Sequence, residues 1–384
     1  MNNSYISSAK KLGILGGGQL GKMLLQCTNT WDVYTKVLEP SADSPCRNLC
    51  NEFVQGSLQD FQTVYDFGKN CDVLTIEIEH VNVEALKKLN AEGVKVHPNP
   101  IALETIQDKG LQKLFYQENN FPTAEFVLCE NKNEALAIAE KWNYQAVQKS
   151  RKAGYDGKGV FVLQSKNEAE NLMDVPCVME RKVALKKEIA VIASRNENGE
   201  VKCFPSVEMD FHAGANMLDL LLFPAQIEKE LEDKAEKIAA ELITKFNICG
   251  LLAVEFFVDE NNQLLINEVA PRPHNSGHQT IESSITSQYE QHLRGILNLP
   301  LGSTTIKMPS AMVNLVGADG FEGDVYYEGM EKCMAKEGVK IHIYGKKKTK
   351  PFRKMGHVTV LHHDINEAKK TAEWVKQNLI VRSL

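Results

Sequence analysis

A glycine-rich turn near the N-terminus constrains the fold more than any other feature of this sequence. Glycines at positions 16, 18 and 21 follow an apolar run and precede a helix-like stretch at residues 21–29. A second apolar run at residues 35–38 ends in Glu39. Strand, glycine turn, helix and strand in this order predict a βαβ unit, and therefore an α/β domain with a parallel sheet.

The ligand of this turn stays open at the level of the motif. The spacing Gly16-x-Gly18-x-x-Gly21, with acidic Glu39 at the end of the next strand, fits the fingerprint of a dinucleotide site. Glycines let the backbone approach a phosphate, and the start of a helix offers N–H groups and a partial positive charge. A nucleotide monophosphate therefore fits equally well, and a tight structural turn is the third alternative.

The length of 384 residues exceeds what one hydrophobic core usually supports, so two or three domains are expected. Strands predicted at residues 72–78 and 93–97 extend the first domain, and two prolines then break the chain. We predict an α/β domain over residues 1–100 and an α+β domain over residues 101–300. Short strands and a final amphipathic helix predict a smaller domain over residues 301–384.

Composition excludes several classes of protein. The net charge of -6 does not favour polyanions, so bulk binding of nucleic acid is not expected. No apolar run approaches the roughly 20 residues of a membrane span. The nine cysteines form no C-x-x-C pair and indicate reduced thiols. We therefore predict a cytoplasmic protein without a nucleic-acid or membrane partner.

A hairpin at residues 253–270 carries two carboxylates. If its turn centres on Asn261 and Asn262, Glu255 and Glu268 face one another as cross-strand partners. Like charges in this position repel and need a cation, and hard oxygen ligands beside substrate phosphates suit Mg²⁺. The alternatives are a structural pair neutralised by a lysine or arginine, or an offset turn that separates the two glutamates.

The loop that follows, residues 270–278, is dense in hydrogen-bond donors and suits an oxyanion. Its His274 and His278 could instead form a metal pair, but no cysteine or third histidine with zinc spacing lies nearby. A solvated loop is the remaining alternative.

A second glycine-rich segment, residues 149–160, follows a strand that ends in Lys149. Its glycines permit unusual dihedrals and free backbone amides, which predicts a mobile cover for phosphates, although such segments are often simple flexible turns. Further on, Glu180 and Glu188 flank a short run that could join two lobes and expose backbone to an adenine.

Together these segments resemble the ATP-grasp superfamily and, within it, the 5-(carboxyamino)imidazole ribonucleotide synthases of purine biosynthesis. The resemblance spans nearly the whole chain. It implies an ATP-grasp fold with an N-terminal Rossmann-like domain, a mobile lid around residues 120–185 and a small C-terminal domain. The segments that carry it are residues 16–23, 75–81, 107–109, 154–159, 267–278 and 353–357.

The resemblance also implies the ligands of individual residues. ATP would contact Lys109, Lys149, Gly154, Tyr155, Asp156, Gly157, Lys158, Gly159, Val160, Glu180, Arg181, Lys182, Val183, Glu188, His212, Asn267 and Glu268. Aminoimidazole ribonucleotide would contact Gly18, Gln19, Leu20, Glu79, Tyr155, Asp156, Lys158, Lys346, Arg353 and Lys354. Glu255 and Glu268 would hold Mg²⁺ or Mn²⁺, and the protein would be a homodimer.

Two departures from the family pattern stand out. Ala153 replaces a usual glycine, and the segment from Lys346 to Arg353 is one residue longer than expected. In the basic run that begins this segment, Lys347 and Lys348 are expected to be surface residues.

The expected activity is ATP- and bicarbonate-dependent carboxylation of the ribonucleotide amine. Arg272, His274 and Asn275 would hold bicarbonate while Lys149 and Mg²⁺ spread the charge of the transferred phosphoryl group. The rivals are another ATP-grasp enzyme, such as the formate-dependent glycinamide ribonucleotide transformylase, a NAD-dependent oxidoreductase, and a nucleotide-binding regulator without turnover.

Overall fold

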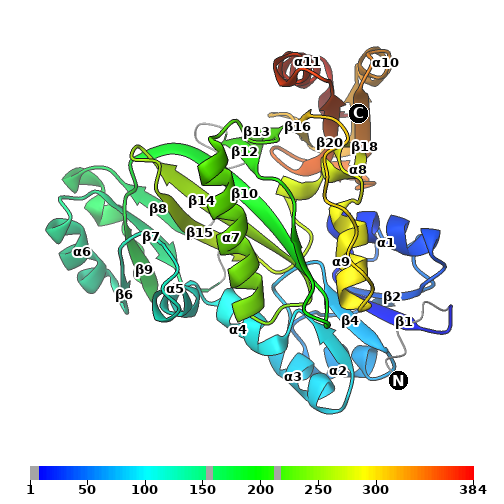
Figure 1. Cartoon of the computed structure of the whole chain (residues 1–384), viewed down its shortest axis with the longest axis horizontal. Coiled ribbons are helices and arrows are strands. Elements are labelled where there is room, and N and C mark those ends of the chain that lie inside the picture. The colour runs from blue at the N-terminus through cyan, green and yellow to red at the C-terminus, as the bar shows by residue number, and fades with distance from the viewer. Residues whose placement is uncertain (1–7, 153–158, 212–217) are drawn as a thin grey trace.

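The N-terminal part of the chain forms a parallel sheet with helices on its faces, as the glycine turn predicts (Figure 1). The computed structural model describes residues 8–152, 159–211 and 218–384. The first elements are β1 (Lys11–Leu15), α1 (Gln19–Thr30), β2 (Tyr34–Glu39), β3 (Glu52–Gln55), α2 (Phe61–Gly68), β4 (Val73–Ile76), α3 (Val83–Ala91) and β5 (Lys95–His97). The strand order is β3-β2-β1-β4-β5. The sequence prediction missed β3, a four-residue edge strand that contains two polar residues.

A helix from much later in the chain completes the core of this first domain. Helix α9 (Gln288–Ile296) packs against α1. Leu24 and Met23 of α1 share one buried cluster with Tyr289 and Leu293 of α9. Burying each large apolar side chain is worth about 1.5–3 kcal/mol, so this shared core fixes the first domain against the second.

A small antiparallel sheet forms a separate lobe, visible at the left of Figure 1. Its strands follow the order β6-β9-β7-β8, and Trp142, Leu163 and Met179 belong to its own core. The sequence predicts strands over residues 146–150 and 160–163, and β7 and β8 have these bounds. The elements of this region are α4 (Pro100–Gln107), α5 (Lys109–Glu118), β6 (Phe126–Cys129), α6 (Lys132–Lys141), β7 (Ala146–Ser150), β8 (Val160–Leu163), η1 (Lys166–Asn171) and β9 (Cys177–Arg181).

The largest sheet runs through the centre of the molecule and into its C-terminal part. Helix α7 covers one face, and its Ile238 and Leu242 pack in the cluster that contains Val191 and Val254. The central elements are β10 (Leu185–Arg195), β11 (Val201–Cys203), β12 (Val207–Phe211), β13 (Leu218–Phe223), α7 (Lys229–Lys245), β14 (Gly250–Asp259), β15 (Leu264–Ala270), η2 (Asn275–Gly277) and α8 (Thr280–Ser283).

The C-terminal elements are β16 (Ser310–Val316), β17 (Gly323–Glu328), α10 (Met330–Met334), β18 (Val339–Ile343), β19 (Lys348–Thr349), β20 (Lys354–Leu361), α11 (Ile365–Asn378) and β21 (Ile380–Ser383). The nine-stranded sheet has the order β15-β14-β10-β12-β13-β16-β20-β18, with β11 beside β10, and a three-stranded sheet has the order β19-β17-β21. The large sheet therefore continues across the boundary predicted at residue 300.

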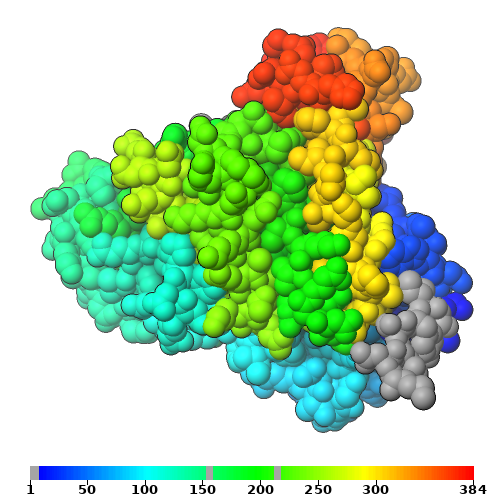
Figure 2. All heavy atoms as spheres, in the orientation of Figure 1, coloured from blue at the N-terminus to red at the C-terminus, as the bar shows by residue number. Residues whose placement is uncertain are grey.

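The space-filling view shows the small antiparallel lobe and the C-terminal part projecting from opposite ends of the central body (Figure 2). Among the described residues, no helix is long and apolar enough to cross a membrane.

Candidate active site

Two glutamates face each other on the hairpin formed by β14 and β15. Glu255 and Glu268 are direct cross-strand partners, so their side chains share one face of the large sheet. Burial and the Glu268 carboxylate raise the pKa of Glu255, whereas the Lys109 ammonium lowers the pKa of Glu268. The pairing predicted from the sequence is confirmed, and a lysine partly offsets the repulsion.

A β-bulge produces this pairing. Near the turn, Phe256 pairs with Ile266, a register centred on residue 261 that would place Glu255 opposite Asn267. A register shift next to Glu255 puts Glu268 there instead. The predicted turn centre, between residues 261 and 262, is therefore wrong by half a residue, and the bulge restores the expected partners.

The bulge also lets two consecutive side chains serve the site. Lys149 Nζ donates to Asn267 Oδ1 at 2.8 Å, and Lys109 Nζ donates to Glu268 Oε2 at 2.7 Å. Consecutive residues of a regular strand would point to opposite faces. Two predicted ATP contacts of β15 thus bind lysines from different elements: Asn267 binds Lys149 of β7, and Glu268 binds Lys109 of α5.

Glu180 of β9 joins these lysines into a network. Its two carboxylate oxygens lie 3.0 Å from Lys113 Nζ and 3.0 Å from Lys149 Nζ. Lys113 also donates to Thr123 Oγ1 at 2.6 Å, and the two lysines together lower the pKa of Glu180 despite its burial. The Glu180 carboxylate is therefore turned toward lysines and positions them, while the expected contact of this residue with ATP through its backbone stays a prediction.

The segment between the two lobes has the connecting role that the sequence suggested. Residues 182–184 lead from β9 of the small sheet to β10 of the large one. The N–H groups of Arg181 and Lys182 donate to the carbonyls of Glu125 and Gln145. Within the described chain, the N–H of Val183 has no recorded acceptor, which leaves it as the candidate donor to an adenine.

Glu188 lies on the same face of the large sheet as the carboxylate pair. It pairs with Phe257, and Glu255 lies two residues before Phe257 on β14, so the side chains of Glu188 and Glu255 point to the same face. Lys149 Nζ lies 6.0 Å from the centre of the Phe257 ring. Burial raises the pKa of Glu188 to about 7. The family resemblance implies that Glu188 contacts the ribose of ATP, and the residue is half-buried on the site face.

The second glycine segment is only partly described. Gly159 has a φ of 75°, its carbonyl accepts from the Ser150 N–H at 2.8 Å, and Val160 begins β8. The remaining predicted contacts Gly154, Tyr155, Asp156, Gly157, Lys158 and His212, together with Ala153, lie outside the described residues.

The loop after β15 brings basic side chains beside the glutamates. Arg272 Nε lies 2.8 Å from Glu79 Oε1, and His274 Nε2 lies 3.6 Å from Glu255 Oε1. Asn275 begins the short helix η2. The predicted bicarbonate ligands Arg272 and His274 are thus linked to a predicted substrate residue, Glu79, and to a predicted metal ligand, Glu255.

His278 occupies a different environment from His274. Its Nδ1 lies 2.9 Å from the Tyr289 hydroxyl, and its ring stacks on His357 with centroids 4.7 Å apart. Burial lowers the pKa of His278 well below its ordinary value. The two histidines therefore do not form a metal pair, because His278 is a packed core residue.

The glycine turn is bound by carboxylates of the protein itself. The N–H groups of Gly18 and Gly21 donate to Glu77 Oε1 and Oε2 at 3.0 and 2.9 Å. The Gly17 N–H donates to Glu39 Oε2 at 2.8 Å. The sequence left the occupant of this turn open, and in the structure Glu77 and Glu39 accept its amides, which favours the alternative of a structural turn. The expected contacts of Gly18, Gln19 and Leu20 with the ribonucleotide stay a prediction.

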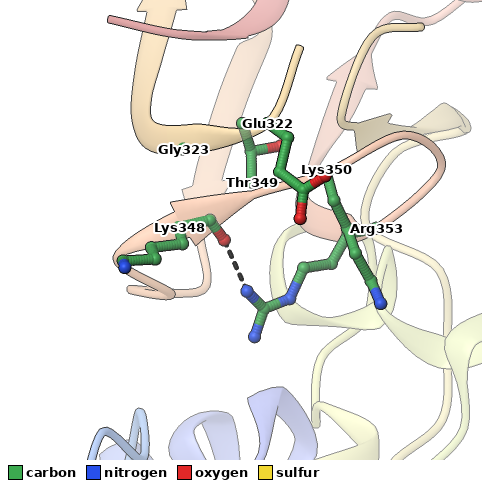
Figure 3. Close-up of a pocket in the computed structure, with 6 residues that line it drawn as sticks. All are labelled: Glu322, Gly323, Lys348, Thr349, Lys350 and Arg353. Carbon is green, nitrogen blue, oxygen red and sulfur yellow. Dashed lines mark hydrogen bonds between the residues drawn. The ribbon is translucent and has the colours of Figure 1, made fainter. Parts of the chain in front are cut away.

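The three predicted substrate residues of the C-terminal part differ in position. Arg353 lines a cavity of about 450 Å³ together with Glu322, Gly323, Lys348, Thr349 and Lys350 (Figure 3). Arg353 and Lys350 extend toward the same side, and Arg353 donates to the Lys348 carbonyl at 2.5 Å. Lys346 donates to the carbonyl of Lys354 at 2.7 Å, and Lys354 is half-buried at the start of β20.

The two lysines of this region that were expected at the surface, Lys347 and Lys348, have different surroundings. Lys347 is exposed and pairs with Asp43 at 2.8 Å, which fits the surface role expected for it. Lys348 is exposed, as expected, and it also lines the cavity.

Sequence reasoning overlooked Lys113, Glu77 and Lys350. Lys113 follows Lys109 by four residues on α5, a spacing that places both on one helix face. Glu77 comes directly after β4, which pairs with β1, the strand that leads into the glycine turn. A carboxylate at the end of β4 could therefore have been predicted to lie beside that turn.

Comparisons with known proteins agree with this geometry. Residues 9–107 match the ribonucleotide synthetase preATP-grasp domain, residues 114–289 the ATP-grasp domain, and residues 310–371 the phosphoribosylaminoimidazole carboxylase C-terminal domain. The chain is 35% identical to the N5-carboxyaminoimidazole ribonucleotide synthase of Bacillus subtilis, over 98% of this chain and 99% of that protein. It is 37% identical to the phosphoribosylaminoimidazole carboxylase of Saccharomyces cerevisiae, but spans 66% of that longer protein.

Solved structures extend the similarity to three dimensions. The N5-carboxyaminoimidazole ribonucleotide synthetase of Thermotoga maritima matches with a TM-score of 0.91 and 40% identity, covering 98% of this chain and 100% of that one. The synthase of Aspergillus clavatus, solved with ADP and 5-aminoimidazole ribonucleotide, matches with a TM-score of 0.87 and 32% identity, covering 96% and 98%.

Proposed function

The chain belongs to the N5-carboxyaminoimidazole ribonucleotide synthase family, and from this membership we propose that it carboxylates the amine of 5-aminoimidazole ribonucleotide with ATP and bicarbonate. The products are N5-carboxyaminoimidazole ribonucleotide, ADP and phosphate, which makes the protein a carbon–nitrogen ligase of purine biosynthesis. The observation that carries the proposal is the facing pair Glu255 and Glu268 with Lys109 and Lys149 beside it.

The residues of this pair fit a magnesium ion. Glu255, Glu268 and the amide oxygen of Asn267 are hard oxygen donors, which Mg²⁺ prefers together with phosphate oxygens. The raised pKa of Glu255 marks a carboxylate that lacks a full counter-charge, and Lys109 pairs with Glu268 instead. When bound with ATP, magnesium would neutralise charge on the β- and γ-phosphates. Manganese, with similar ligand preferences, would be a substitute.

Bicarbonate is a weak nucleophile and a poor electrophile, so it must be activated. We place it against Arg272, His274 and Asn275, whose loop leaves the same hairpin as the carboxylate pair. A bicarbonate oxygen attacks the γ-phosphorus, the bond to ADP breaks, and carboxyphosphate forms. Lys149 donates hydrogen bonds to the transferred group and is held for this role by Asn267 and Glu180.

The ribonucleotide amine then attacks the carboxyl carbon, either of carboxyphosphate or of CO₂ released from it. Phosphate leaves, and the amine loses a proton to give the carbamate. Water would hydrolyse the intermediate, so the site has to close during this step. The small antiparallel lobe, joined to the large sheet at residues 182–184, is the part of the molecule suited to that closure.

The test is phosphate release from ATP in the presence of bicarbonate, with and without 5-aminoimidazole ribonucleotide. We expect bicarbonate-dependent ADP formation and one carbamate formed per ADP when the ribonucleotide is present. Binding of ATP without ADP release under every condition would instead identify a nucleotide-binding regulator. Formate-dependent turnover of glycinamide ribonucleotide would identify the other ATP-grasp activity.

Two further expectations belong to this proposal. The family resemblance supports a homodimer, which sedimentation equilibrium would measure. It also supports a cytoplasmic location, which fractionation of the source cells would measure.

A further inference from the structure

A carboxylate of the protein occupies the place at the start of α1 where a nucleotide phosphate would otherwise lie. We propose that Glu77 is a specificity-determining residue that closes this anion site, so that the phosphate of the substrate is bound only by basic side chains of the C-terminal part. The proposal rests on the proposed function in so far as the substrate is a ribonucleotide.

The side chain of Glu77 is buried, which raises its pKa, but both of its carboxyl oxygens are occupied by backbone donors. Each of its two oxygens accepts one backbone N–H, from Gly18 and from Gly21. These are amides near the start of α1, the groups that bind phosphates in glycine-turn sites. A ligand phosphate would have to displace the Glu77 carboxyl group, because both amides are already bound to its oxygens.

The glycines of the turn are explained by Glu77 without any ligand. A Cβ atom at Gly16 would lie 2.6 Å from Glu77 Cγ, and one at Gly18 would lie 2.9 Å from Glu77 Oε1. Both distances are too short for a real side chain. The spacing that resembles a dinucleotide fingerprint is therefore required here to pack an internal carboxylate. Glu39 closes the remaining side of the turn by binding the Gly17 N–H.

A surplus of positive charge lies in the C-terminal part. Lys348, Lys350 and Arg353 line its cavity, against one acidic residue, Glu322. This part of the chain contacts α1 directly, since Lys22 Nζ donates to the carbonyl of Ile343 at 2.8 Å. A ribonucleotide between the two parts would therefore meet carboxylates at the glycine turn and cations at the cavity.

These charges orient the substrate. The phosphate is directed to the C-terminal cavity, and Gln19 and Leu20 contact the uncharged portion of the molecule rather than the phosphate. The amine end of the substrate then lies toward Glu79, two residues after Glu77, and toward Arg272, in the loop after β15. These two side chains form an ion pair, with Arg272 Nε 2.8 Å from Glu79 Oε1. This is the side on which bicarbonate is placed.

The experiment compares the binding of inorganic phosphate to the full-length wild type and to Glu77→Ala by isothermal titration calorimetry. Opening the turn should create a phosphate site that the wild type lacks, seen as an additional equivalent or as binding at least fivefold tighter. Glu92→Gln, which removes an exposed carboxylate of the same domain, should titrate like the wild type. A folded Glu77→Ala that binds phosphate no better than the wild type would overturn the proposal.

If Glu77→Ala does not fold, Glu77→Gln keeps one acceptor for the glycine amides and still removes the charge, with the same expectation. A measurement without any change at Glu77 uses Arg353→Gln, in which inorganic phosphate should compete at least fivefold less strongly with the ribonucleotide in calorimetric binding. Unchanged competition would place the phosphate elsewhere and contradict the proposal. These titrations need no turnover, so they are distinct from a failure of the ligase assay itself.

Discussion

At Glu255 and Glu268, two like charges are held opposite each other and the neighbouring cations divide unevenly between them. Lys109 pairs with Glu268, while the pKa of Glu255 is raised by burial and by Glu268. A site arranged in this way favours ligands that bring positive charge to Glu255. The pair is therefore more readily explained by a metal–nucleotide complex than by the stability of the apo chain.

Glu268→Gln keeps the size of the side chain and removes its charge. We expect the variant to fold with nearly wild-type thermal stability and to lose at least about 100-fold in bicarbonate-dependent ADP release, the scale seen when one group that stabilises transition-state charge is removed. Glu260→Gln, an exposed residue of the same hairpin, is the matched control. Near-normal turnover in Glu268→Gln would remove this residue from the metal site.

Glu188 offers a test by pH. Burial raises its pKa to about 7 in the folded chain, above the ordinary value near 4.3, so the folded state holds the proton more tightly than the unfolded state. The contribution to stability is full below about pH 4 and is lost as the pH rises through 7. Glu188→Gln should therefore equal the wild type near pH 4 and exceed it by about 1–3 kcal/mol at pH 8.

Denaturant unfolding at several pH values measures this difference, and parallel curves for the two proteins would contradict it. The same variant should raise the KM for ATP, because the proposed ribose contact is weakened.

At the level of elements, the β14–β15 hairpin shows how far sequence reasoning reaches. Alternating apolar residues around a polar turn were enough to predict the two strands and the facing glutamates. The bulge was not predictable, because nothing in the pattern indicates which residue of Phe256, Asn267 or Glu268 leaves the ladder. The predicted pairing of Glu255 with Glu268 was therefore right, but it results from the bulge and not from the predicted turn centre. The bulge also places Asn267 and Glu268 on one face.

The glycine turn shows the opposite case. Its spacing correctly predicted strand, turn and helix, because glycine is the residue that fits a φ of 99° at position 16. The ligand could not be predicted, since the group that fills the turn comes from Glu77, 59 residues after Gly18. Short motifs specify backbone shape, whereas the occupant depends on contacts that only the fold brings together.

The buried network of Lys113 and Glu180 links α5 to the small lobe. Lys113→Met should cost about 2 kcal/mol, less than the 3–5 kcal/mol usual for breaking a buried ion pair, because Lys149 still pairs with Glu180. In a double-mutant cycle with Glu180→Gln, the combined cost should be smaller than the sum by about 1 kcal/mol or more.

Lys141→Met, an exposed change at the end of α6, is the control for this series. Additive costs for Lys113→Met and Glu180→Gln in chemical denaturation would mean that the two side chains do not act together.

At the level of the whole molecule, the domains predicted from the sequence share a sheet and a hydrophobic core. The large sheet passes from β13 to β16, and α9 completes the core of the N-terminal sheet. A stack of three histidines adds to this junction: His357 lies 4.7 Å from His278 and 4.4 Å from His342 between ring centroids. The central and C-terminal parts thus meet through stacked imidazole rings, of which His278 and His357 are fully buried.

This stack makes the junction sensitive to acid. Burial lowers the pKa of His278 and His357 well below the ordinary value near 6.5, so the unfolded chain binds more protons than the folded chain as the pH falls below 6.5. Stability should therefore decline between pH 7.5 and 5, by about 2 kcal/mol at pH 5 for each histidine that stays neutral when folded. The third ring of the stack, His342, lies with its Nε2 2.7 Å from Glu282 Oε1.

His357→Phe keeps an aromatic ring in the stack and removes the titrating group. It forfeits the contact between His357 Nδ1 and the Tyr344 hydroxyl at 3.1 Å, a cost of about 1 kcal/mol that is the same at every pH. The variant should therefore be somewhat less stable than the wild type at pH 7.5, yet lose about 2 kcal/mol less on going to pH 5. His362→Phe, which changes an exposed histidine at the end of β20, should follow the wild-type slope. If His357→Phe and the wild type decline in parallel, acid acts elsewhere and the stack does not set the pH limit of the junction.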